Sequence, residues 1–72
     1  MQARIAGFRD AGGGVYVILL DNDQAWRHED AHRASFLRVG DPVVIRRGSL
    51  GSYWLHRESD GTRNGIRVTR IR

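Results

Sequence analysis

Residues 15–28 read VYVILLDNDQAWRH, and this stretch decides the class of fold. Its first half, Val15 to Leu20, is β-branched, aromatic and apolar throughout, which is the composition of a strand. Because the residues that would point to either side are all apolar, we expect both faces of this strand to be covered, as in a tightly curled barrel. Asp21-Asn22-Asp23 then predicts a turn, and Gln24 to His28 predicts a second strand. The stretch therefore indicates a β-hairpin within an all-β domain.

The turn of this hairpin is predicted as a two-residue loop of Asn22 and Asp23. Such a loop requires a positive φ at both positions. Asn22 accepts that conformation readily, whereas Asp23 accepts it less well than glycine would. The residue pairs that follow from this register are Leu19 with Trp26 and Val17 with His28.

Turns rich in glycine and polar residues separate further apolar segments on both sides of the hairpin. The additional strands that they predict are 3–8, 43–47, 52–57 and 66–71. Residues 29–39 are predicted to form either a loop or a short helical turn. The 72 residues form one domain with a thin core. We predict a small all-β barrel of five or six antiparallel strands, SH3-like, with an OB-like arrangement as the alternative.

The turn at 48–51 determines the face on which Trp54 lies, because a slip of one residue moves every side chain across the sheet. A three-residue loop would place Tyr53 opposite Ile45, and a four-residue loop would place Trp54 there instead. We favour the first, which leaves Trp54 on the outer face beside Val44. The side chains that it groups inside the barrel are Val43, Ile45, Tyr53 and Leu55.

Three segments resemble a family of small proteobacterial domains: LDNDQAWR at 20–27, VVIRRG at 43–48 and LGSYWL at 50–55. That family carries an L-[DE]-N-G-Q-x-W core, an apolar strand, a G-x-L-G-S-Y-like turn and an Arg-rich last strand, here IRVTRIR at 66–72. The chain departs from the pattern by placing Asp23 where the family has glycine. The resemblance implies an SH3-like fold and exported or envelope-associated proteins, but no activity.

The composition bounds the function and the location. The net charge is +4, and all twelve basic residues are arginines interspersed with eight acids, which favours a solvated mixed-charge surface over a dedicated phosphate-binding one. No cysteine is present, so disulfides and thiolate metal sites are excluded.

No apolar run approaches a membrane span, and Met1 to Ile5 does not resemble a secretory signal. We expect a cytoplasmic location for the chain as it stands, or a periplasmic or envelope location if a signal segment has been removed.

One sequence motif could carry enzymatic chemistry. Residues 28–32 read HEDAH, the H-E-x-x-H pattern in which two histidines on one helical face bind zinc and the glutamate activates water. Only His56 or Glu58 is available as a third ligand, and a chain this short offers no substrate cleft. We therefore interpret His28 and His32 as solvated residues, and expect no catalytic residue, no metal and no cofactor.

The residues most suited to binding are aromatic and arginine side chains. Trp26 and Tyr53 are predicted to belong to the core, as are Phe8 and Phe36. The candidate binding residues are Trp54, Arg46, Arg67 and Tyr16, because Trp, Tyr and Arg dominate binding energies at interfaces. We predict a non-catalytic module that binds a protein or peptide. The alternative is a nucleic-acid-binding domain in which the same residues stack bases and pair with phosphates.

Overall fold

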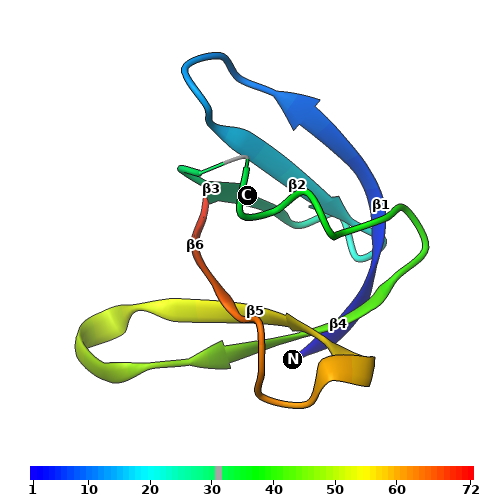
Figure 1. Cartoon of the computed structure of the whole chain (residues 1–72), viewed down its shortest axis with the longest axis vertical. Coiled ribbons are helices and arrows are strands. Elements are labelled where there is room, and N and C mark those ends of the chain that lie inside the picture. The colour runs from blue at the N-terminus through cyan, green and yellow to red at the C-terminus, as the bar shows by residue number, and fades with distance from the viewer. Residues whose placement is uncertain (31) are drawn as a thin grey trace.

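A computed structural model describes residues 1–30 and 32–72. These residues form six strands and two short 3-10 helices. The strands are β1 (Gln2–Asp10), β2 (Tyr16–Leu20), β3 (Ala25–His28), β4 (Pro42–Arg47), β5 (Tyr53–Arg57) and β6 (Ile66–Arg70), and the 3-10 helices are η1 (Ser49–Gly51) and η2 (Glu58–Asp60) (Figure 1). The all-β class and the predicted strands are confirmed. Within the described ranges, no helix is long and apolar enough to cross a membrane.

The strands close into a barrel in the order β1-β2-β3-β6-β5-β4, and every neighbouring pair is antiparallel. The strand β1 takes part in both halves of the barrel. Residues 2–4 pair with β4 and residues 5–10 pair with β2, and the β1–β2 pairing contains an irregularity between Ile5 and Gly7. Figure 1 shows this strand curving from one sheet to the other. The result is a small closed barrel, consistent with the predicted SH3-like or OB-like architecture.

The barrel interior holds one cluster of buried apolar side chains, and Trp26 is the largest of them. Its indole Nε1 donates a hydrogen bond to Gln24 Oε1 at 3.1 Å. Its ring packs edge-on against the ring of Tyr53, and the two ring centroids are 5.2 Å apart. The other members of the cluster are Ile5, Ile18, Leu20, Ala34, Leu37, Val43, Ile45, Leu55, Ile66 and Val68. Trp26 thus belongs to the core as predicted, while Tyr53, Phe8 and Phe36 are half-buried against it.

The β2–β3 turn corrects the predicted register by one residue. The loop contains three residues, 21–23, because Leu20 N donates to Gln24 O at 2.9 Å. Asp23 N donates to Leu20 O, and Asp23 then adopts a left-handed φ of 68°, which is the usual geometry of a three-residue hairpin loop. Trp26 consequently lies opposite Ile18, and His28 lies opposite Tyr16. The prediction of a two-residue loop was therefore wrong, although Asp23 does have the positive φ that a two-residue loop would have required.

The β4–β5 hairpin corrects the predicted pairing by two residues. Gly48 N donates to Ser52 O at 2.7 Å, so the loop does have three residues, and they are 49–51. With the loop at this position, Ile45 lies opposite Leu55 rather than Tyr53. A shift of two residues preserves the faces of a strand. Ile45 and Leu55 are therefore buried, and Trp54 is on the outer face, as predicted, but its neighbour in β4 is Arg46 rather than Val44.

The segment 29–39 forms consecutive turns in its described part; Ala31 lies outside the described residues. Three turns follow one another, with Arg33 N donating to Asp30 O, Ser35 N to His32 O and Leu37 N to Ala34 O. Ala34 and Leu37 are buried in the apolar cluster, so the segment adds a cover to the barrel interior. Of the two predicted alternatives, the described part is a loop.

Candidate functional site

Three of the four candidate binding residues lie side by side on the barrel surface. Trp54 of β5 is directly opposite Arg46 in β4 and directly opposite Arg67 in β6. The row exists because the three strands are antiparallel neighbours and each of these residues points away from the core. We call the outer face of β4, β5 and β6 around this row the Trp54 face.

Trp54 is 39% exposed, and its indole rests against the hairpin from which it projects. Gly48 lies directly beneath it, because a β-carbon built there would be 2.7 Å from the indole Nε1. The absence of a side chain at position 48 therefore lets the ring lie against the backbone. What remains uncovered is an apolar surface between two arginines, which is an arrangement suited to contact with a ligand.

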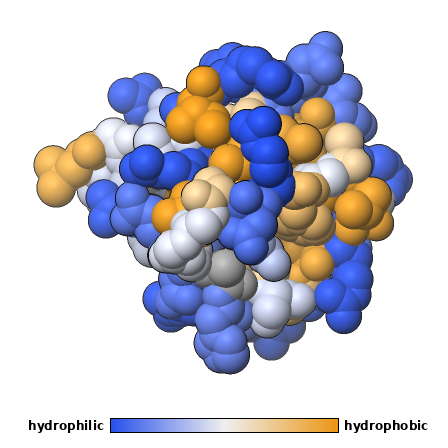
Figure 2. Space-filling view, turned by 90° about the horizontal axis from the view of Figure 1, so that it is seen from above, coloured by the Kyte–Doolittle hydropathy of each residue, from blue (hydrophilic) through white to orange (hydrophobic). Residues whose placement is uncertain are grey.

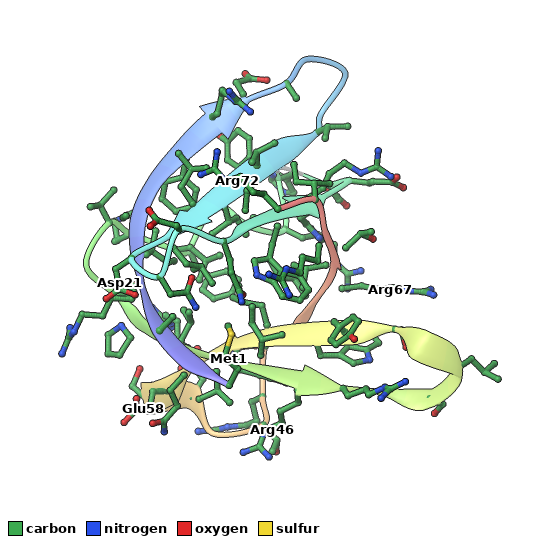
Figure 3. All side chains as sticks on the ribbon, turned by 180° about the vertical axis from the view of Figure 1, so that it is seen from behind. Met1, Asp21, Arg46, Glu58, Arg67 and Arg72 are labelled. Carbon is green, nitrogen blue, oxygen red and sulfur yellow. The ribbon has the colours of Figure 1, made fainter. Side chains whose placement is uncertain are left out.

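A groove of about 560 Å³ lies beside Trp54. Its basic and aromatic lining comes from Trp54, Arg67, Arg27 and Arg33, and its acidic lining from Glu29 and Asp30. Arg46 lies outside this groove, and Figure 3 shows the Arg46 and Arg67 side chains leaving the barrel in different directions. Arg46 and Arg67 therefore flank Trp54 in the sheet, but only Arg67 shares the groove with it.

Arg27 and Arg33 are groove residues that the sequence analysis did not select. Arg27 belongs to β3 and donates to Glu29 Oε1 at 2.8 Å, an exposed pair of small energetic value. Arg33 belongs to the loop after β3. The alternation of β3, in which Trp26 and His28 are buried and Arg27 is exposed, could have indicated the outward position of Arg27. Nothing in the sequence indicated that the loop returns Arg33 to the same groove.

The fourth candidate, Tyr16, lies apart from the Trp54 face. It is half-buried on β2 opposite His28, and its ring centroid is 6.0 Å from that of Phe8. Tyr16 packs against the apolar cluster of the interior. The structure thus joins three of the four candidates and assigns the fourth to core packing.

The strands around the Trp54 face are rich in arginine and contain no acidic residue. Residues 42–57 and 66–72 contain six arginines and no aspartate or glutamate. One of the six, Arg57, forms a bidentate pair with Asp60, in which Nε and a terminal nitrogen donate at 2.8 and 3.2 Å. These hydrogen bonds hold the pKa of Asp60 below its usual value. Only Arg46 and Arg67 of the six lie in the Trp54 row, and the groove beside Trp54 also contains Glu29 and Asp30. The charge around Trp54 is therefore mixed, with more arginines than carboxylates.

The H-E-x-x-H segment does not place its histidines on one helical face. His28 is the last residue of β3 and is buried, so its interpretation as a solvated residue was wrong. Its Nδ1 lies 2.7 Å from the carbonyl oxygen of Arg67. His32 is exposed in the turns that follow. Among the residues that the structure describes, no group of three or more His, Asp or Glu side chains could hold a metal ion. We expect a chelator to leave the melting temperature unchanged, and stoichiometric zinc that is lost in His32→Ala would contradict this.

Comparison with known proteins adds no relative: no family model, no curated protein and no solved structure matches the chain.

Proposed function

We propose that this domain is a non-catalytic interaction module that binds a protein or peptide on the Trp54 face. The observation that carries the proposal is the position of Trp54, partly exposed between Arg46 and Arg67 in the same row of the sheet. A tryptophan in this position gains from the removal of apolar surface from water only when a ligand covers it. Tryptophan and arginine are also the residues that most often dominate binding energy at protein interfaces.

The groove beside Trp54 supports a ligand of modest size. Its volume of about 560 Å³ can take a few side chains of an extended segment, and its walls offer both arginine donors and carboxylate acceptors. Such mixed polar walls around an aromatic residue are suited to a polypeptide, which presents donors, acceptors and apolar groups together.

A nucleic acid is the second candidate ligand, and one specific observation favours it. The strands of the Trp54 face and the residues after β6 carry six arginines and no acid, and a basic surface with an exposed aromatic ring can hold a single strand by phosphate pairing and base stacking. The two candidates differ in their response to salt, because phosphate binding weakens steeply as the salt concentration rises.

Selection from a display library of random peptides, using the purified domain as bait, tests the proposal. We expect peptides that bind the parent domain and lose affinity for Trp54→Ala. The matched control is Val39→Ala, which removes an apolar side chain that is more exposed than Trp54 and lies outside the Trp54 face. If the domain selects no peptide but binds oligo(dT) with a steep salt dependence, the nucleic-acid candidate replaces the proposal.

A further inference from the structure

The turn of the β4–β5 hairpin carries a leucine that is unfavourable by two local criteria. Leu50 is fully exposed, and its φ and ψ of 57° and 33° lie in the left-handed region. Ser52 N donates to Ser49 O across Leu50 and Gly51, and both of these residues have positive φ. Such turns prefer Asn-Gly or Gly-Gly, because an L side chain at a positive φ is strained. Neither burial nor backbone conformation accounts for a leucine at this position.

The hairpin presents Leu50 away from the body of the barrel. Figure 1 shows the β4–β5 turn extending beyond the other strands, and Figure 2 shows a hydrophobic group projecting on the same side. Residues that break local rules without a structural gain are expected at functional positions. An exposed aliphatic side chain gains free energy only in contact with another apolar group, and a polypeptide supplies such groups more readily than a sugar-phosphate chain does.

A second groove, of about 260 Å³, joins Leu50 to two arginines of β6. It lies between the hairpin turn and β6, and Leu50, Arg67 and Arg70 all line it. Both arginines are exposed, and neither pairs with a described aspartate or glutamate; Arg70 Nε donates to the main-chain oxygen of Arg72 at 3.1 Å, which leaves its terminal nitrogens for a ligand. No aspartate or glutamate lines this groove, so its two arginines can accept an acidic ligand without repulsion from a neighbouring carboxylate. We call this site the turn groove.

We infer that the turn groove binds an acidic segment of a partner protein, whose carboxylates pair with Arg67 and Arg70 and whose apolar side chain covers Leu50. This inference rests on the proposed function and names the class of its ligand. Arginine is suited to the role because its planar guanidinium can hold a carboxylate through two parallel hydrogen bonds. The segment continues from the turn groove onto Trp54, since Arg67 lines both grooves.

The composition of the peptides selected by the domain tests this inference first. We expect enrichment in Asp and Glu next to an apolar residue. A selected acidic peptide should bind Arg70→Gln at least about tenfold more weakly, a loss of about 1.4 kcal/mol. The matched control is Arg9→Gln on β1, an exposed arginine that does not line the turn groove and should change the affinity less than about twofold.

Leu50→Asn supplies a test in which stability and binding move in opposite directions. The change creates the Asn-Gly pair that the turn prefers, so the melting temperature should rise, by about 4 °C for a gain near 1 kcal/mol in a domain of this size. The same variant should bind the acidic peptide at least about tenfold more weakly. A variant that is both more stable and weaker in binding assigns Leu50 to the interface.

The inference and the proposed function fail in different ways. Selected peptides that depend on Trp54 but are neutral or basic, and that bind Arg70→Gln and Leu50→Asn as well as they bind the parent, would overturn the inference and leave the proposed function standing. Binding of oligo(dT) without any selected peptide would overturn both.

Discussion

The indole of Trp54 lies on Gly48, so closely that a β-carbon on Gly48 would be 2.7 Å from Nε1 and 2.9 Å from Cδ1. Gly48 has a φ of −97°, which any residue adopts, so the glycine is required by the ring and not by the backbone. The orientation of Trp54 therefore depends on glycine at position 48, because any larger side chain there would collide with the ring.

Gly48→Ala should displace the indole without unfolding the domain. We expect the NMR signal of the Trp54 indole N–H to shift and that of buried Trp26 to stay in place, with a loss of peptide affinity. Gly7→Ala is the matched control, because a β-carbon there would meet only Leu19, at an ordinary 3.8 Å. An unchanged Trp54 signal in Gly48→Ala would contradict the position of the ring.

Asp23→Gly should stabilise the domain by roughly 0.5–1 kcal/mol. Asp23 has a φ of 68°, which glycine adopts without the strain that a β-carbon brings. The side-chain Nε of Arg72 donates a hydrogen bond to the carbonyl oxygen of residue 23, which glycine retains, so this bond survives the change. Denaturant melts measure the effect, and Asp23→Ala is the control, since it removes the same carboxylate but keeps a β-carbon. If Asp23→Ala stabilises the domain by the same amount, the cause is the loss of the carboxylate charge and not the relief of backbone strain.

The ion pair of Arg57 and Asp60 should make stability depend on acid pH. The hydrogen bonds from Arg57 lower the pKa of folded Asp60, so the ionised carboxylate favours the folded state. This contribution is present above the pKa of Asp60 in the unfolded chain, about 4, and is lost as the pH falls through the lower folded value. The free-energy difference between the parent and Asp60→Asn should thus be largest near neutral pH and shrink in acid. A difference that stays constant between pH 7 and pH 2 would show that the pair does not perturb this carboxyl.

The sequence predicted the class of fold because strand composition and turn residues are local signals. It misplaced the β2–β3 register because Val15 to Leu20 is apolar at every position, so alternation could not show which residues face inward. The β4–β5 pairing was wrong by two residues, yet the faces were right, because a shift of two residues returns every side chain to the same face of its strand.

The site was predicted only in part, for a physical reason. Trp54, Arg46 and Arg67 could be grouped because strands adjacent in sequence form antiparallel neighbours, and the structure places them in one row. The pairing of β3 with β6 closes the barrel and brings Arg27 to the same groove as Arg67. Barrel closure joins strands that are distant in the sequence, and no local pattern reports it.

The most direct test of the central claim, that Trp54 is a contact residue on the outer face, is a paired measurement on Trp54→Ala. The account predicts a change in the free energy of unfolding of less than about 1 kcal/mol, together with a loss of about 2 kcal/mol or more in the binding of a selected peptide. Destabilisation by roughly 3–5 kcal/mol would mean that the indole belongs to the core. Unchanged stability with unchanged peptide binding would leave the barrel intact and remove the Trp54 face as the binding site.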